Sequence, residues 1–164
     1  MKLLLDTTYF LPTIGVAVKY FPRNIVIELI NKGYSVLVSE ITLFELSAKG
    51  AKYVASGLLK AERVIRGIKA LFYDDRVRKV PVHETSALLT ALELRKLLSD
   101  FIDCLILSAA LNYADALITE DEDIHMLLEN EKFLKIIQEK NPEFEIMNYS
   151  TLKNRRLSDS NGYL

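Results

Sequence analysis

Acidic residues stand where the apolar runs of this chain stop. The run 3–5 ends in Asp6, and the run 116–119 ends in Glu120 and Asp121. A short run that is apolar at every position is typical of a strand buried on both faces of a parallel sheet. In such a sheet, ligands bind outside the carboxyl ends of the strands. The sequence therefore predicts that these acids converge on one crevice.

Two further acids lie inside apolar stretches that we predict to be helical. Glu45 lies in the stretch 41–46, and Asp103 lies in the stretch 101–107. Bringing like charges together away from water is costly unless a cation neutralises them. Mg²⁺ and Mn²⁺ prefer oxygen ligands, usually a few carboxylates together with water and substrate phosphate. We therefore expect Mg²⁺ or Mn²⁺ among these acids.

Length, composition and charge limit the architecture. The 164 residues, 50% of them hydrophobic, suffice for one domain with a sizeable core. We predict that this domain spans residues 1–149 and that a polar, flexible tail follows over residues 150–164. The formal net charge of -1 gives no global field that would attract a polyanion, so any nucleic-acid contact must be local.

The N-terminal segment and the single cysteine indicate the compartment. Cys104 has no partner for an internal disulfide, which suits a reducing cytosol. Asp6 interrupts the first apolar run far short of the length that a signal peptide needs. No uncharged stretch approaches the ~20 residues of a membrane span. We expect a soluble, cytoplasmic protein that makes no membrane contact.

Apolar periodicity and turn residues predict strands that alternate with helices. Gly50 is expected to close one helix, and Pro81 to place its strand at a sheet edge. This alternation predicts a three-layer α/β/α fold around a central, mainly parallel sheet of four to five strands. The predicted strands are 2–6, 35–38, 77–82, 116–119 and 144–147. The predicted helices are one that begins near residue 9, four that span 22–32, 40–49, 52–72 and 85–98, one that begins at residue 100, and one that spans 122–140 with a break.

Each acid also has a local role that must be weighed. Asp6 can cap the helix that follows it, and Asp121 with Asp123 can complement a helix dipole. Asp100 and Asp103 can form a capping pair at the start of one helix. These roles must all hold at once to explain the set, whereas one metal crevice explains it with a single cause. The sequence favours the crevice.

Other site chemistries lack their motifs. The six glycines form neither a dinucleotide-binding fingerprint nor a P-loop, which makes a nucleotide-cradling enzyme a poor fit. The two histidines, His83 and His125, are far apart, so a histidine-based zinc site or catalytic triad has little support.

The ordered set of acidic motifs resembles the PIN domain family over roughly residues 2–147. The segments that carry the resemblance are 3–8, 45–46, 103–110 and 117–121. The resemblance implies a Mg²⁺- or Mn²⁺-dependent endoribonuclease of the VapC-like class. Its core acids match Asp6, Glu45, Asp103 and Asp121, a less regular fifth acid matches Asp123, and a hydroxyl residue that orients the first aspartate matches Thr119.

The resemblance also implies partners and individual roles. The expected substrate is single-stranded or structured RNA, and the expected protein partners are an antitoxin and a second copy of the chain in a homodimer; an RNA-processing enzyme is the other variant of this class. Asp6 and Asp103 are the leading metal ligands, and Asp121 and Asp123 bind directly or through water. Glu45 is either a ligand or orients water.

Two other function classes remain open at this point. The first is a PIN-like interaction module that is catalytically weak or inactive. The second is a phosphatase with Asp6 as its nucleophile, although Thr8 stands where haloacid-dehalogenase-like enzymes have a second aspartate. A basic neighbourhood offers either an RNA path or an ordinary solvated helix face, and it comprises Arg63, Arg66, Lys69, Arg76, Arg78 and Lys79.

Overall fold

A five-stranded parallel sheet forms the centre of the protein. The structure, a computed structural model, describes residues 1–160, and the side chains as far as residue 155. The strand order is β3-β2-β1-β4-β5, and each neighbouring pair is parallel. The predicted α/β class and the sheet are confirmed. The strands are β1 (Lys2–Leu5), β2 (Ser35–Ser39), β3 (Val77–Val80), β4 (Ala116–Ile118) and β5 (Glu145–Met147).

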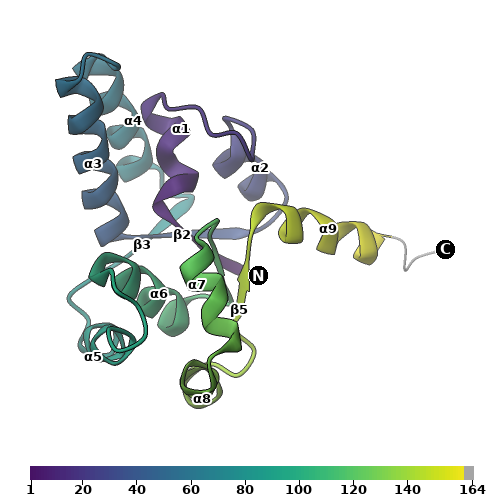
Figure 1. Cartoon of the computed structure of the whole chain (residues 1–164). Coiled ribbons are helices and arrows are strands. Elements are labelled where there is room, and N and C mark those ends of the chain that lie inside the picture. Colours follow the sequence, from purple (N-terminus) through teal and green to yellow (C-terminus); the bar gives the residue numbers. More distant parts are fainter. Residues whose placement is uncertain (161–164) are drawn as a thin grey trace.

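Helices cover both faces of this sheet (Figure 1). Successive residues of β1 point to opposite faces, so Leu3 and Leu5 join one core while Leu4 joins the other. The first core packs under α1 (Leu11–Ile14), α2 (Ile25–Asn31), α3 (Glu40–Ala55) and α4 (Ala61–Tyr73). The second packs under α5 (Thr85–Leu94), α6 (Phe101–Tyr113), α7 (Glu122–Met126) and α8 (Glu131–Lys140), and short 3₁₀ turns η1 (Thr7–Phe10) and η2 (Leu127–Glu129) complete the layers.

The strand order fixes where a ligand can bind. The chain passes from β1 to β2 on one side of β1, and later returns to place β4 on the other side. The helical connections leave these two central strands in opposite directions, which opens a crevice beyond their carboxyl ends. Leu5 of β1 is level with Ile118 of β4, so the residues that follow them, Asp6 and Thr119, meet at that crevice.

The helical region after β2 differs from the sequence-based prediction. The helix does not close at Gly50, and no single helix covers 52–72; α3 runs through to Ala55, and α4 begins at Ala61 after a turn in which Gly57 has φ +74°. A Cβ at Gly50 would lie 2.5 Å from Val64 Cγ1, so the missing side chain lets α4 pack closely against α3. Gly50 therefore serves helix packing rather than helix termination.

A second glycine allows α4 to approach α1. A Cβ at Gly67 would lie 2.2 Å from the backbone carbonyl oxygen of Thr13, which cannot rotate away. We expect Gly67→Ala to lower the free energy of unfolding by about 2 kcal/mol, because overpacking against backbone outweighs the better helix propensity of alanine. Urea denaturation measures this, with the exposed Glu62→Ala on the same helix as the control. Equal stability of the two variants would contradict this packing role.

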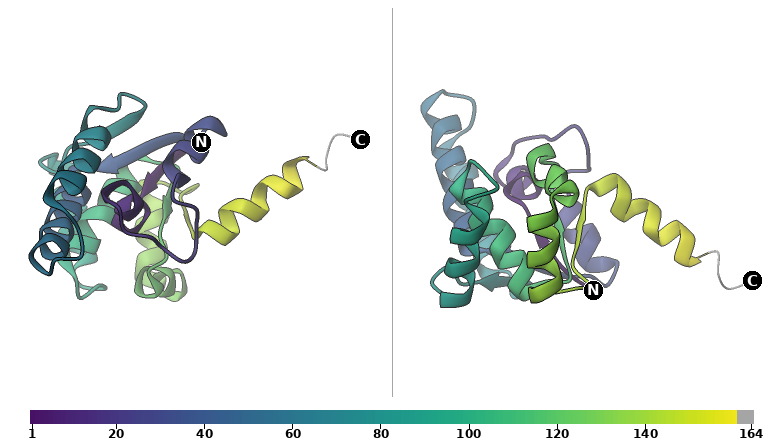
Figure 2. Two further views of the ribbon diagram at one scale, coloured as in Figure 1. Left: turned by 90° about the horizontal axis from the view of Figure 1, so that it is seen from above. Right: turned by 60° about the horizontal axis from the view of Figure 1, so that its bottom comes forward.

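The polar C-terminal segment begins as a helix. Helix α9 (Tyr149–Ser160) covers residues 150–160 of the segment that was predicted to be a flexible tail. Leu152 is buried in the first core, while the rest of the helix projects away from the sheet in every view (Figures 1 and 2). Residues 161–164 of the predicted tail lie outside the described residues. Within residues 1–160, no helix has the length and apolar character that spanning a membrane requires.

Candidate metal centre

Asp6 lies at the carboxyl end of the central strand β1. Its backbone N–H donates to the Ile118 carbonyl oxygen at 3.0 Å, which ties it to the end of β4. Its Oδ1 accepts the Thr7 backbone N–H at 2.6 Å and its Oδ2 accepts the Thr119 hydroxyl at 3.2 Å. Asp6 therefore caps the following turn and also lies in the crevice. One carboxylate oxygen accepts the capping hydrogen bond, and the other lies beside Thr119 at the end of β4.

Thr119 links the acids that follow the two central strands. Its fully buried hydroxyl donates to Asp6 and accepts the Asp121 backbone N–H at 3.1 Å. Asp121 in turn caps α7, since its Oδ1 accepts the Ile124 N–H at 3.1 Å. From the other side, a ring nitrogen of His125 donates to the Thr119 carbonyl oxygen at 3.0 Å. One threonine thus fixes the relative positions of two of the predicted metal ligands.

Glu45 reaches the same crevice from α3. The Thr7 hydroxyl donates to its Oε2, and the Lys49 ammonium lies 2.8 Å from its Oε1. Thr7 also donates its backbone N–H to Asp6, so this residue bridges the two carboxylates. The hydrogen bonds hold Glu45 toward Asp6 rather than toward solvent.

Burial and neighbouring negative charges raise the pKa of two of these acids, Asp103 and Asp6. Burial raises the pKa of Asp103 on α6 to about 7, and the negative charges of Asp100, Asp121, Asp6 and Glu45 add to this effect. Burial likewise raises the pKa of Asp6 to about 6, with the Glu45 charge contributing, although hydrogen bonds from Thr7 and Thr119 oppose the rise. The structure thus brings together four acids that are as far as 115 positions apart in the sequence, from Asp6 to Asp121.

Two other candidate acids, Asp100 and Asp123, lie at the N-terminal ends of α6 and α7. Asp100 caps α6, because its Oδ1 accepts the Ile102 N–H at 2.7 Å. Asp123 is exposed on α7 and lines a separate pocket of about 310 Å³ that Leu98 and Ser99 also line. Its predicted role as an additional ligand stays a prediction.

The donor chemistry fits a hard divalent cation. Asp6, Asp103 and Asp121 offer carboxylate oxygens in a partly buried crevice, where their mutual repulsion favours a bound cation. Among the side chains of residues 1–155, however, no three acidic, histidine or cysteine side chains are placed so that they could hold a metal ion. Thr7 and Lys49 already contact the two carboxylate oxygens of Glu45. The acids have to move closer together to coordinate one ion.

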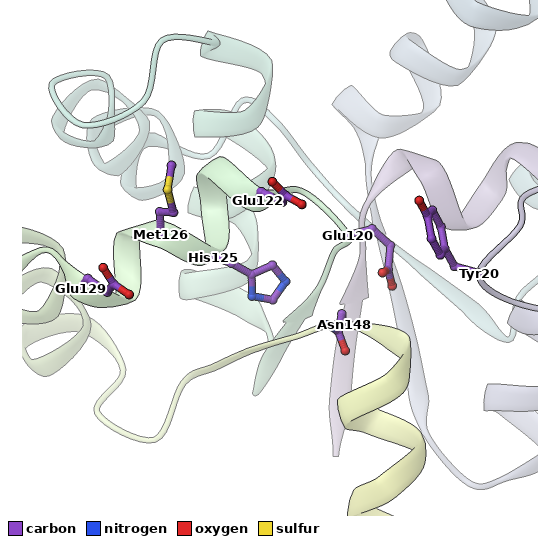
Figure 3. Close-up of a pocket in the computed structure, with 7 residues that line it drawn as sticks. All are labelled: Tyr20, Glu120, Glu122, His125, Met126, Glu129 and Asn148. Atoms are coloured by element: carbon purple, nitrogen blue, oxygen red, sulfur yellow. The ribbon is translucent and has the colours of Figure 1, made fainter.

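Glu120, which follows Thr119, contacts Tyr9 and the start of α9 instead of the other acids. Its Oε1 accepts the Tyr9 hydroxyl at 2.5 Å and the Tyr149 backbone N–H at 2.9 Å, so it anchors the start of α9. Burial and the Glu120 contact both raise the pKa of Tyr9. Figure 3 shows Glu120 at the wall of a cavity of about 530 Å³. The residues that line this cavity are Tyr20, Glu120, Glu122, His125, Met126, Glu129 and Asn148.

Sequence reasoning missed two members of the crevice. Thr7 follows Asp6 directly, but nothing in the sequence indicates that its hydroxyl reaches a helix 38 residues away. Lys49 had a usable signal, because a glutamate and a lysine four positions apart meet on one helix face.

Three members of the predicted basic neighbourhood have structural partners: Arg63 donates to Thr13, and Arg76 and Lys79 both contact Asp74.

The fold is a parallel sheet between helical layers, with carboxylates gathered at the end of its central strand. Comparison with known proteins identifies the family to which this fold and this site belong. The family model of the PIN domain matches residues 4–127, more than half of the chain. The chain therefore belongs to the PIN domain family, as the acidic motifs predicted. No curated protein sequence is similar enough to match.

Two solved structures share the fold. VapBC2 from Rickettsia felis, bound to a DNA fragment from its promoter, contains a chain with a TM-score of 0.56 and 20% sequence identity, and the match covers 90% of this chain and 98% of that chain. DNA-bound VapBC from Salmonella typhimurium contains a chain with a TM-score of 0.55 and 22% identity over the same shares. At these identities the likeness concerns the fold.

Proposed function

We propose that this protein is an endoribonuclease that depends on Mg²⁺ or Mn²⁺ and cleaves phosphodiester bonds of single-stranded or structured RNA. The observation that carries the proposal is the approach of four carboxylates at the carboxyl ends of β1 and β4, where the pKa of Asp6 and of Asp103 is raised. A crevice that accumulates negative charge at a ligand-binding edge favours a divalent cation, and such a cation suits phosphodiester chemistry.

Each residue has a distinct part in this proposal. Asp6, Asp103 and Asp121 hold the metal directly, and Asp123 acts through water. The Thr7 and Thr119 hydroxyls orient Glu45 and Asp6, and Glu45 completes the ligand set or orients the attacking water. The chemistry that the metal supplies when bound is activation of water and neutralisation of charge on the phosphate.

The proposed substrate, single-stranded or structured RNA, rests mainly on the likeness to the PIN domain family. A metal site beyond the ends of two strands suits a splayed backbone better than a rigid duplex, which favours single-stranded or looped RNA. Arg66, Lys69 and Arg78 are basic residues at or near the surface of α4 and β3, and they are candidates for phosphate contacts at a distance from the acids. Phosphate contacts of this kind make binding weaker as salt rises.

We also propose two protein partners and a compartment. The two structural neighbours are VapBC complexes, which supports an antitoxin as a partner of this chain and hence the role of a toxin. Leu89 and Leu92 on α5 are each 58% exposed, which suits a homodimer contact, and light scattering should then give twice the chain mass. Cys104 is buried and free, in keeping with a cytoplasmic protein.

One observation favours a second candidate function. Because no three side chains within the described part are spaced to hold a metal, an inactive PIN-like interaction module is the alternative. Cleavage of a labelled RNA pool with Mn²⁺ or Mg²⁺, and its loss with a chelator, separates the two functions. Cleavage supports the proposed nuclease, whereas its absence under both metals, together with a stable protein partner, supports the interaction module.

Replacing Thr119 tests the proposed positioning of the two aspartates. Thr119→Val has nearly the same shape but leaves the Asp121 N–H without its acceptor, so we expect the free energy of unfolding to fall by about 1–3 kcal/mol. Cleavage should fall about 10- to 100-fold, the usual effect of losing a residue that orients a metal ligand. Thr119→Ser keeps the hydroxyl and should retain most activity. Similar activity in both variants would exclude an orienting role for the hydroxyl.

A further inference from the structure

Lys49 places a positive charge against the acidic crevice. It lies one turn after Glu45 on α3, and its Nζ is 2.8 Å from Glu45 Oε1. The Lys49 side chain is 41% exposed and that of Glu45 is 24% exposed, so the carboxylate end of the pair is the more sheltered. The other oxygen of Glu45 accepts the Thr7 hydroxyl beside Asp6. The ion pair is therefore built into the site and does not simply lie on the helix surface.

The charge of Lys49 also extends beyond Glu45. It lowers the pKa of Asp6, against the larger and opposite effect of burial. One lysine thus acts on two of the four carboxylates that approach one another here. A divalent cation that binds Glu45 approaches the carboxylate oxygen that Lys49 contacts. The ammonium group of Lys49 therefore repels this cation.

We propose that Lys49 is an internal counter-ion of the metal site, which holds the Glu45 carboxylate and competes with the divalent cation for it. Lys49 is thus a positioning residue that weakens metal affinity while stabilising the metal-free protein. This inference rests on the proposed metal-dependent function, because it assumes that a cation binds among the acids. An ordinary helix-stabilising pair predicts no effect on metal affinity, since pairs of this spacing act within their own helix.

Mn²⁺ binding to the full chain, measured by isothermal titration calorimetry, tests this inference. Lys49→Met keeps much of the aliphatic stem and removes the charge. We expect it to bind Mn²⁺ about three- to tenfold more tightly, the range that follows from the usual strength of such a pair together with the lost repulsion. The same variant should melt at a lower temperature than wild type without metal. A purely structural lysine would not produce these two opposite effects.

Matched variants make the outcome specific. Lys49→Arg keeps the charge and should bind Mn²⁺ about as wild type does. Lys52→Met removes a charge from the exposed last turn of α3 and should change neither affinity nor melting temperature. Higher salt should narrow the gap in affinity between wild type and Lys49→Met, because screening weakens the competing ion pair.

The failure of this inference can be told apart from the failure of the proposed function. If wild type binds Mn²⁺, Asp6→Asn does not, and Lys49→Met binds with unchanged or lower affinity, the counter-ion role is wrong while the metal site stands. If wild type, Lys49→Met and Lys49→Arg all bind no Mn²⁺, the metal site and the counter-ion role are both wrong. Tighter binding by Lys49→Met alone supports both.

Discussion

Asp6→Asn should abolish metal-dependent cleavage, by a factor of at least about 10³, and should make the metal-free protein more stable. The first effect follows from the loss of a charged ligand at the centre of the crevice. The second follows because burial raises the pKa of Asp6 to about 6, so the ionised side chain destabilises the fold above that pH. Near pH 8 the expected gain in the free energy of unfolding is about 1–3 kcal/mol.

The asparagine also preserves the local hydrogen bonds. Its side-chain oxygen can still accept the Thr7 N–H, and its amide group can donate to the Thr119 hydroxyl. Asp115→Asn is the matched control, because Asp115 precedes β4 at the opposite end of the sheet and accepts the Lys2 N–H at 2.7 Å. RNA cleavage and urea denaturation without metal measure the two effects. Undiminished cleavage by Asp6→Asn would refute its assignment as a ligand.

Asp103→Asn should produce the second largest loss, about 10²- to 10³-fold in cleavage, together with a changed dependence of stability on pH. Burial and four neighbouring negative charges raise the pKa of Asp103 to about 7 from its ordinary value of 3.8. Between about pH 4 and pH 7, Asp103 therefore keeps its proton in the folded state, whereas the same residue in the unfolded chain has lost it. Stability is highest below about pH 4 as far as this group is concerned, and it is lost as the pH rises through about 7.

The pH dependence gives a test that needs no activity. Without metal, the free energy of unfolding of wild type should fall between pH 4 and pH 7, and Asp103→Asn should flatten that fall. Asp100→Asn is the control for cleavage, because asparagine retains the cap that Asp100 provides for α6. It should flatten the fall in stability only in part, because the Asp100 charge is one of several causes of the raised pKa of Asp103. Cleavage should stay near wild type in this control. If instead Asp100→Asn loses cleavage and Asp103→Asn keeps it, Asp100 is the ligand.

The sheet and the crevice could be predicted because they depend on local patterns. Runs such as 3–5 and 116–118 are apolar at every position, which only a strand buried on both faces explains well. Asp6 follows the first run directly, and Glu120 and Asp121 follow the second after Thr119. Parallel pairing then places these ends side by side. A break between two helices was predicted at Gly50, but the structure places it between Ala55 and Ala61. The sequence could not show this, because Gly50 is needed for close packing against Val64, which depends on tertiary structure.

The details of the site depend on contacts between distant segments. The Thr7 hydroxyl finds Glu45 only because α3 packs beside the end of β1. Similarly, Glu120 looks like another ligand in the sequence, yet its contacts with Tyr9 and Tyr149 direct it to the base of α9. The residue types and their order in the sequence indicate the kind of site. Tertiary packing decides which of the neighbouring acids Glu120 and Asp121 enters the crevice.

Anomalous diffraction from crystals soaked in Mn²⁺ tests the central claim most directly. We predict a manganese peak at the carboxyl ends of β1 and β4, within coordination distance of Asp6 and of Asp103 or Asp121, with Glu45 drawn closer. Mn²⁺ should also raise the melting temperature of the wild-type chain in solution, since a ligand that binds only the folded state stabilises it. Crystals with manganese elsewhere, or with none among these acids at saturating Mn²⁺, would contradict the account.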